Sequence, residues 1–300
     1  MYRQKNEVQQ GMLLALFSYC AWGFLPLYFK SLSDLSSVDI LIHRIVWSTL
    51  LTLVMVIVAG KLSFVLSVFT SLKKLWPFVL SALLLSANWL IYIYATLHHD
   101  IMQISLGYFI NPILNMLFGM VIFSERVGRL SKLAMMLAGL GLLVRLSDFE
   151  HFPWLALGIA LAFSLYGVVR KKAKADAASG LFIETSVLLI PALAWMFFVG
   201  GTTSFELMNN AWDYSLLLMM AGPVTTIPLI AFSLAVKKIP YYLMGFCQYL
   251  TPSILLLLAI FLYDEAWTRN ELLTFGLVWI GIVLALSETF YRSRTREASD

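Results

Sequence analysis

The feature that most constrains this 300-residue chain is a succession of apolar stretches, each long enough to cross a lipid bilayer. A helix of about 20 apolar residues spans a hydrocarbon core of about 30 Å. Ten such stretches can be marked, covering residues 11–30, 38–59, 76–97, 101–123, 130–146, 153–171, 180–200, 214–236, 240–262 and 272–291. Little chain remains outside them. The sequence therefore predicts an all-α membrane protein with ten transmembrane helices.

Composition supports this interpretation over a large soluble domain. The chain is 60% hydrophobic with a mean hydropathy of +0.83, whereas soluble domains are about 45–50% apolar. The first stretch is followed by further spans, and no small-residue cleavage site is evident, so we expect a retained helix and not a removed signal peptide. Cys20 and Cys247 lie inside predicted spans, where cysteine usually serves as a small packing residue.

The positive charges predict the orientation of the chain, because Lys and Arg accumulate in cytoplasmic loops. Most of the 21 Lys and Arg residues fall in alternate connections between the stretches. The exceptions are Lys30, Arg44, Arg145 and Arg269. This bias predicts cytoplasmic N- and C-termini and an even number of spans. The net charge of +4 is then a topology signal and gives no reason to expect a nucleic-acid partner.

A weak internal repeat divides the chain into two halves. Moving the sequence against itself by 140 residues aligns Pro112 with Pro252, Glu125 with Glu265, Arg129 with Arg269 and Gly141 with Gly281. We therefore predict two repeats, residues 1–148 and 149–300, with five spans each. Because five is odd, the second repeat enters the membrane inverted, the arrangement of many secondary transporters. The alternative is ten apolar helices with coincidental matches.

Proline stands in the middle of two corresponding spans, as Asn111-Pro112 and Thr251-Pro252. Proline lacks an N–H and clashes with the carbonyl four residues earlier, so it interrupts a helix. Freed backbone groups are tolerated at membrane depth only inside protein or beside a wet cavity. We therefore expect Pro112 and Pro252 to break their helices at a central binding site.

Polar side chains next to these prolines form a candidate solute site. Tyr108, Asn111 and Asn115 share one helix face by their spacing, and Gln248 and Thr251 occupy the positions equivalent to the first two. Such groups can hydrogen-bond a polar solute in a cavity near the midplane. The alternative is that they join helices to one another, at about 0.6 kcal/mol per contact.

The third span adds an aromatic wall to this candidate site. Asn88 and Tyr92 lie four residues apart on one face, with Trp89 beside it. Aromatic residues near the ends of spans usually belong to the interfacial belt, but Trp89 and Tyr92 lie deeper. An aromatic wall suits an amphipathic or aromatic solute.

Ionisable residues inside spans are functional hypotheses by default, and here they are His43, Arg44 and Glu184. Arg44 lies about 9 Å below the outer end of its helix and Glu184 about 6 Å above the inner end of its own, at about 1.5 Å per residue. A direct Arg44–Glu184 ion pair is therefore not expected. Each residue either serves a vestibule or coupling, or extends its charge to the interface.

Other charged residues give weaker signals. Glu125 and Glu265 follow spans and are expected to cap the following helix or pair with a nearby Arg. His98, His99 and Asp100 form an external turn, but adjacent residues seldom all face one ion, so no metal site is expected. The sequence has no P-loop, HExxH, GxSxG or paired-cysteine motif, so neither a cofactor nor direct ATP coupling is expected.

The run Ser105-Leu-Gly-Tyr-Phe-Ile-Asn-Pro-Ile113, together with His43-Arg44, Asn88-Trp89 and Gln248-Tyr249, resembles the RarD family of bacterial inner-membrane permeases. That family belongs to the EamA-type drug/metabolite transporters. The resemblance implies two inverted five-helix repeats around a central cavity, alternating access and a place in the bacterial inner membrane. Gln103 departs from the family pattern, which often has Glu there, and this puts a proton-carrying role at that position in doubt.

These observations predict a secondary transporter or facilitator of a small organic solute such as a drug, an amino acid or another metabolite, in contact with membrane lipid. The residues expected to line its site are Asn88, Trp89, Tyr92, Tyr108, Asn111, Gln248 and Tyr249. Two rivals remain: a membrane-embedded enzyme, for which no nucleophile or acid–base cluster is visible, and a non-transporting subunit or sensor. The small-residue face of Ala134, Ala138 and Gly141 suits helix packing, and a homodimer stays open.

Overall fold

The structure is a computed structural model that describes the chain except for residues 1, 98–100, 148, 199–210, 264–267 and 298–300. Every regular element in the described part is an α-helix. In chain order the helices are α1 (Tyr2–Gly23), α2 (Leu25–Lys30), α3 (Ser37–Val58), α4 (Leu62–Phe69), α5 (Leu72–Leu97), α6 (Ile101–Ile122), α7 (Arg129–Leu146), α8 (Trp154–Lys172), α9 (Ala177–Phe198), α10 (Trp212–Met219), α11 (Ala221–Lys238), α12 (Tyr241–Gln248), α13 (Leu250–Tyr263) and α14 (Arg269–Glu297).

Each predicted apolar stretch is helical, and three of them consist of two helices in succession: α1–α2, α10–α11 and α12–α13. Among the described residues, nine helical segments are long and apolar enough to cross a membrane. The remaining stretch, 130–146, corresponds to α7, whose 18 residues include Arg129, Lys132 and Arg145. The membrane-spanning all-α fold is confirmed, and a tenth span at α7 stays a prediction.

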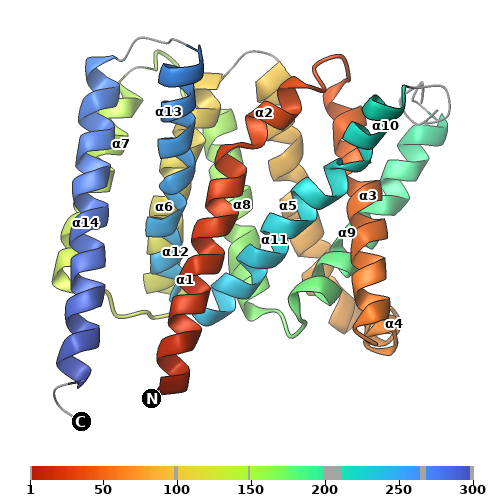
Figure 1. The fold of residues 1–300 in the computed structure, drawn as a ribbon, viewed down its shortest axis with the longest axis horizontal. Coiled ribbons are helices and arrows are strands. Elements are labelled where there is room, and N and C mark those ends of the chain that lie inside the picture. Colours follow the sequence, from red (N-terminus) through yellow and green to blue (C-terminus); the bar gives the residue numbers. More distant parts are fainter. Residues whose placement is uncertain (1, 98–100, 148, 199–210, 264–267, 298–300) are drawn as a thin grey trace.

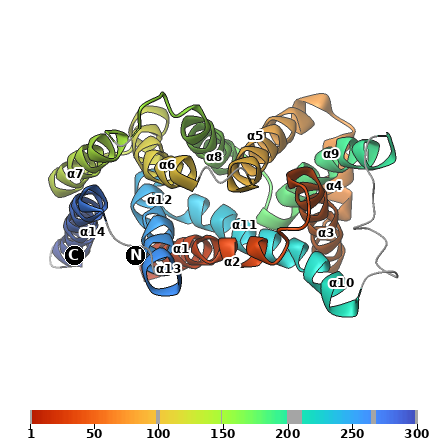
Figure 2. The same cartoon turned by 90° about the horizontal axis from the view of Figure 1, so that it is seen from above.

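The helices form two layers, seen clearly from above (Figure 2). One layer contains α7, α6, α8, α5 and α9, with extensive contacts of α8 to both α6 and α5. The other contains α14, α13, α1, α11 and α3, in which α11 contacts both α1 and α3. The layers are joined most extensively by the pairs α7–α14, α6–α12 and α3–α9.

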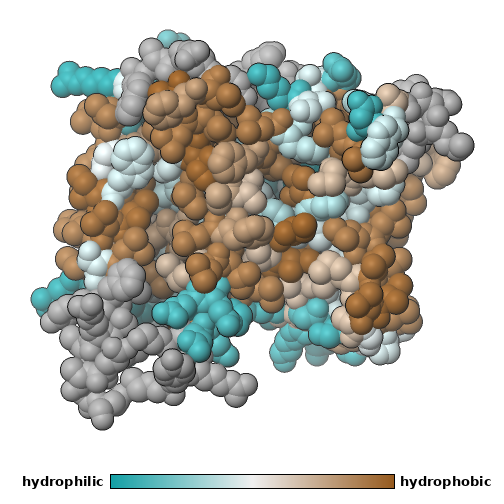
Figure 3. Space-filling model, in the orientation of Figure 1, coloured by the Kyte–Doolittle hydropathy of each residue, from teal (hydrophilic) through white to brown (hydrophobic). Residues whose placement is uncertain are grey.

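Both chain ends lie on the same side of the bundle, where α1 begins and α14 ends (Figure 1). On the face shown in Figure 3, hydrophobic side chains cover the middle while hydrophilic ones gather toward the two ends. This belt is what a bilayer requires, since lipid can satisfy no polar group.

The two central prolines differ in their effect on the helix. α6 continues through Pro112, so the predicted break at Pro112 is wrong: a single missing N–H is bridged by the hydrogen bonds of the turns on either side. The span containing Pro252 is divided at Tyr249, between α12 and α13. Because Pro252 has no N–H, it cannot bond the carbonyl of Gln248, four residues earlier, where α12 ends.

Small residues let α7 and α14 approach closely. A Cβ on Gly141 would lie 3.2 Å from the Thr274 carbonyl oxygen, and one on Gly281 would lie 3.0 Å from the Ala134 carbonyl oxygen. The Thr274 hydroxyl donates to the Gly141 carbonyl at 3.2 Å. The face containing Ala134 and Gly141 therefore packs within the chain, and does not offer itself to a second copy.

We predict that Gly141→Val destabilises the protein by about 1–3 kcal/mol, because the added side chain overpacks a close helix crossing. Gly139→Val is the matched control on the same helix, since a Cβ at Gly139 would meet nothing within 4 Å. Thermal unfolding of the purified proteins in detergent measures the stability of both variants. Equal melting temperatures for the two would contradict the prediction.

Candidate functional site

A cavity lies between the two layers. Its volume is about 50 Å³, enough for a few water molecules and too small for an organic solute. It is lined by Tyr19, Trp22, Leu25, Arg44, Asn88, Trp89, Tyr92, Tyr108, Asn111, Ile159, Phe163, Leu229, Gln248 and Thr251. The structure therefore represents a contracted state in which side chains from both layers nearly meet.

Most of the predicted site residues converge on this cavity. Of the seven expected, Asn88, Trp89, Tyr92, Tyr108, Asn111 and Gln248 line it. Tyr249 does not, and its ring instead packs against Phe109 at a centroid distance of 6.1 Å. Consecutive residues on a helix point about 100° apart, and this turn directs Tyr249 toward Phe109 while Gln248 faces the cavity.

Hydrogen bonds between side-chain amides join the two layers next to the cavity. Asn115 donates to the Asn111 side chain at 3.1 Å and to the Gln248 side chain at 2.6 Å. Asn111 donates in turn to the Ala160 carbonyl of α8 at 3.0 Å. On the opposite layer Thr251 donates to the Tyr19 carbonyl of α1 at 2.8 Å. These side chains both hold helices together and present polar atoms to the cavity.

Aromatic rings form the rest of the wall. Trp22 packs edge-on against Phe163 at 5.2 Å, and Tyr92 packs edge-on against Tyr108 at 6.2 Å between centroids. Asn88 donates to the Ile159 carbonyl at 3.0 Å, which holds α5 against α8. The lining is thus mostly aromatic and aliphatic with a smaller number of polar groups, as in small-molecule sites generally.

Arg44 lies on the cavity wall, and its predicted role in a vestibule or in coupling stays a prediction. Its side chain is 3% exposed, and its Nε donates to the Thr225 hydroxyl of α11 at 3.0 Å. The guanidinium carbon lies 4.3 Å from the Trp89 ring centroid and 5.3 Å from that of Phe29. A desolvated cation–π contact contributes about 2 kcal/mol. In the described part of the chain, no carboxylate forms an ion pair with Arg44.

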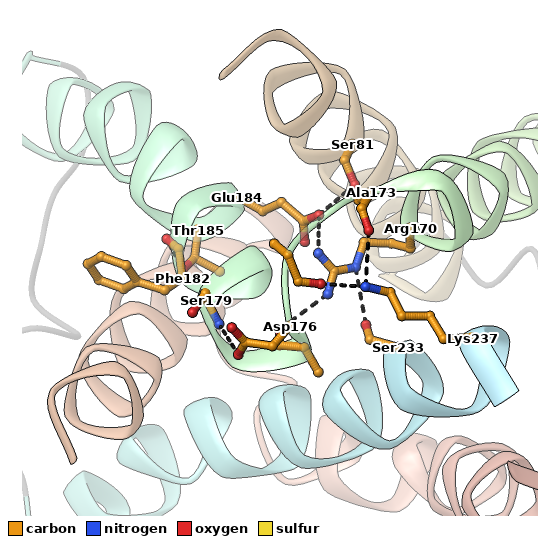
Figure 4. Close-up of polar contacts among 12 residues, drawn as sticks. Ser81, Arg170, Ala173, Asp176, Ser179, Phe182, Glu184, Thr185, Ser233 and Lys237 are labelled. Carbon is orange, nitrogen blue, oxygen red and sulfur yellow. Dashed lines mark hydrogen bonds and ion pairs between the residues drawn. The ribbon is translucent and has the colours of Figure 1, made fainter. Parts of the chain in front are cut away.

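Glu184 lies away from the cavity, in a buried ion pair with Arg170 (Figure 4). The Arg170 Nη1 and Glu184 Oε1 atoms are 3.2 Å apart, and both side chains are 0% exposed. Ser81 donates to the same Glu184 oxygen at 2.6 Å. Arg170 also donates through Nε to Ser233 and through Nη2 to the Ala177 carbonyl, each at 3.2 Å. This cluster joins α5, α8, α9 and α11.

Sequence reasoning missed Arg170 because it was counted among the basic residues of a cytoplasmic connection. Two signals pointed to it: Glu184 in a span needs a cation, and Arg170 lies within the last residues of the preceding apolar stretch, 153–171. Gly180 provides the room, since a Cβ there would lie 1.9 Å from the Arg170 Nη1 atom. Arg44 and Glu184 have separate partners, in line with the expectation that they form no pair.

Two residues left open by the sequence cap helices. The Glu125 carboxylate accepts from the amides of Tyr241 and Tyr242 at 2.7 and 2.9 Å, at the start of α12 and not of the following helix. Lys171 lies 3.6 Å from the same carboxylate. Gln103 accepts from the Leu155 amide at 3.1 Å, in the first turn of α8.

Some residues singled out by the sequence take no part in the site as described. Glu265 and the His98-His99-Asp100 turn lie outside the described residues, so their predicted roles stay untested. His43 accepts from the Trp47 ring N–H at 3.2 Å within α3. The described part of the chain contains no group of three His, Cys, Asp or Glu side chains that could hold a metal ion.

Comparison with known proteins identifies a family and several similar proteins. Residues 9–147 match the EamA-like transporter family. An uncharacterized transporter of Vibrio cholerae is 37% identical over 95% of this chain and 94% of its own length. Protein RarD of Escherichia coli is 36% identical over 96% of this chain and 98% of its own. A solved crystal structure with 16% identity has a TM-score of 0.68, covering 92% of this chain and 98% of that one.

We predict that Glu184→Leu destabilises the protein by about 3–5 kcal/mol, because it leaves Arg170 as a buried cation without its anion. The double variant Arg170→Met/Glu184→Leu should recover much of that loss, since neither charge remains. Thermal unfolding in detergent measures all three forms.

The control for this prediction is Lys61→Gln, which removes the exposed Lys61–Asp176 pair. Exposed pairs contribute about 1 kcal/mol or less, so Lys61→Gln should change the melting temperature little. A double variant that is no more stable than Glu184→Leu alone would contradict the assignment of a charge-driven loss.

Proposed function

Because this chain belongs to the EamA-like transporter family and is a membrane transporter homologous to RarD proteins, we propose that it moves a small organic solute across the bacterial inner membrane by alternating access. The observation that carries the proposal is the cavity between the layers, which is enclosed by aromatic and amide side chains. It acts as a secondary transporter or facilitator, with its termini in the cytoplasm.

We further propose that residues 1–148 and 149–300 form two inverted five-helix repeats. The α7–α14 crossing supports this through a reciprocal contact. Gly141 packs on Thr274 while Gly281 packs on Ala134, and a shift of 140 residues turns Ala134 into Thr274 and Gly141 into Gly281. A two-fold relation requires such reciprocity, in which each surface contacts its own copy.

The contacts between whole helices support the same relation. If the second repeat begins at α8, then α8 corresponds to α1, α9 to α3, α10–α11 to α5, α12–α13 to α6 and α14 to α7. The contacts α1–α11, α1–α13 and α3–α11 then have counterparts in α8–α5, α8–α6 and α9–α5. The pairs α7–α14, α6–α12 and α3–α9 correspond to themselves. The exchange also turns one layer into the other (Figure 2).

The cavity lining follows the repeat as well. Four pairs of lining residues are separated by 140 positions: Tyr19 and Ile159, Trp89 and Leu229, Tyr108 and Gln248, and Asn111 and Thr251. Corresponding positions of the two halves thus contribute to one site, as expected for an inverted-repeat transporter. The paired residues differ in chemistry, so the two halves supply different parts of the recognition.

Close contacts on the side that carries the basic residues fit a closed cytoplasmic gate. A Cβ on Gly119, near the end of α6, would lie 2.8 Å from the Tyr242 amide nitrogen in the first turn of α12, so the two helices lie directly against each other there. The Arg170–Glu184 pair fastens α8 to α9 near the same end of α8. We propose that Glu184 serves gating by holding these helices together. Access from the cytoplasm then requires α12 to separate from α6.

The homologues argue against one of the two rival interpretations, and an experiment is needed to test the other. The homologues are transporters and not enzymes, which removes the membrane-embedded enzyme. A non-transporting subunit or sensor is separated from a transporter by reconstitution: proteoliposomes that contain only this chain should move solute. The solute for that assay comes from a thermal stability screen of metabolites and drugs, since binding to the folded state raises the melting temperature.

We predict that Asn111→Leu abolishes transport while the protein still inserts and folds. Leucine removes both the donor to the Ala160 carbonyl and the acceptor for Asn115, so the polar wall of the cavity is lost. Solute flux in proteoliposomes is the measurement, with the amount of inserted protein quantified.

The matched control is Ser287→Leu, a polar-to-leucine change on the exposed surface of α14, where the hydroxyl bonds only the Val283 carbonyl. That variant should transport at the wild-type rate. Full flux by a correctly inserted Asn111→Leu protein would remove Asn111 from the proposed site.

A further inference from the structure

We propose that the transported solute is a small organic monoanion, an aromatic or apolar body bearing one carboxylate, and that Arg44 binds this carboxylate. The inference rests on the proposed function, because it places the solute in the cavity between the layers. It goes further by assigning the charge of the solute and the residue that recognises it.

The first observation is that Arg44 is a buried cation whose surroundings are neutral. Its described neighbours on four other helices are Thr225 of α11, Trp89 and Tyr92 of α5, Tyr108 of α6, and Tyr28 and Phe29 of α2. None of them carries a negative charge at neutral pH. Burying a charge is costly unless an opposite charge accompanies it. A hydroxyl and two aromatic rings replace only part of the lost hydration.

The second observation is that the cavity offers no other charge. No Asp or Glu occurs among its lining residues. Asp39 lies on the same helix as Arg44, more than one turn earlier. Its carboxylate accepts a hydrogen bond from Ser36 at 2.7 Å. In the described part of the molecule, the anion that would neutralise Arg44 therefore has to come from the solute.

The geometry of the guanidinium group suits a carboxylate. Its Nε is used by Thr225, while neither terminal nitrogen has a hydrogen bond among the described residues. These two nitrogens form the outer edge of a planar fork, which matches the two oxygens of a carboxylate. Arg44 lines the cavity, so its guanidinium group is available to a solute once the cavity has widened.

The need to neutralise Arg44 further restricts the class of solute. A monoanion forms a neutral pair with one guanidinium, whereas a phosphate dianion would leave one negative charge buried without a partner. An amino acid would bring an ammonium group, and no carboxylate lines the cavity to receive it. The remaining lining is mainly aromatic and aliphatic, with Trp22, Tyr92 and Phe163 prominent, which fits an aromatic or apolar body.

Three probes with the same phenyl ring and carbon chain test this inference: 3-phenylpropionate, 3-phenylpropanamide and phenylalanine. Purified wild-type protein in detergent is titrated with each, and the melting temperature gives an apparent Kd. We expect the carboxylate to bind at least about tenfold more tightly than the amide, since hydrogen bonds between charged partners are the stronger ones. Phenylalanine should bind more weakly than 3-phenylpropionate because of its ammonium group.

The variants separate recognition by Arg44 from a general effect of charge. Arg44→Gln should abolish the preference for the carboxylate, and Arg44→Lys should retain part of it. Arg145→Gln is the matched control, because it removes another buried guanidinium that lies outside the cavity and pairs with Glu271. That control should keep the full preference. The comparison of probes on the wild-type protein needs no variant to fold.

The outcomes distinguish this inference from the transport proposal. Equal or tighter binding of the amide or of phenylalanine to the wild-type protein, or no binding by any probe, would overturn the inference. So would a carboxylate preference that survives Arg44→Gln. In these cases flux of any solute in proteoliposomes still upholds the proposed function. Carboxylate binding that depends on Arg44 without flux would instead sustain the site and refute transport.

Discussion

Lipid cannot hydrogen-bond a polar group, and this constraint governs where the chain places its amides, hydroxyls and charges. The amides of Asn111, Asn115 and Gln248 bond to one another across the layers. The Arg170–Glu184 pair is enclosed by hydroxyls and a backbone carbonyl. Polar interior groups therefore do two things at once: they satisfy each other, and they specify which helices are neighbours. Arg44 is the member of this interior set that pairs with no anion among the described residues.

Glycine makes these polar contacts possible, because a missing side chain is the space that a neighbour's polar group fills. The Arg170 guanidinium occupies the place of a Cβ at Gly180, and the Tyr241 hydroxyl occupies the place of one at Gly167. Tyr241 donates from there to the Ser164 carbonyl at 2.7 Å. Helix association in membranes depends on close approach, since lipid tails give no hydrophobic driving force between helices. Position by position, the small residues thus determine where polar groups meet.

The sequence predicts the spans and most of the cavity lining because both depend on strong local signals. Apolar length defines a span, and a polar face in such a span must point inward, which identified Asn111 and Gln248. It failed where the answer depends on a distant partner. The position capped by Glu125 lies on α12, the cation beside Glu184 was assigned to a loop, and Tyr249 faces away from its neighbour. At Pro112 the local rule was too strong, since the hydrogen bonds of the turns on either side keep α6 intact. The repeat and the roles of the site residues await experiment.

The contrast between an intact α6 and a divided α12–α13 has a consequence for the energetics of the transport cycle. If the two halves exchange conformations, the continuous helix α6 must adopt the conformation of the interrupted pair α12–α13, and that pair must adopt the conformation of α6. The helix is already interrupted at Tyr249, whereas bending α6 at Pro112 requires breaking hydrogen bonds that are present now. The inward- and outward-facing forms would then differ in free energy without any solute or gradient. Without solute, most molecules would then have the site open toward the same side of the membrane. The cause would lie in the different backbones of α6 and α12–α13.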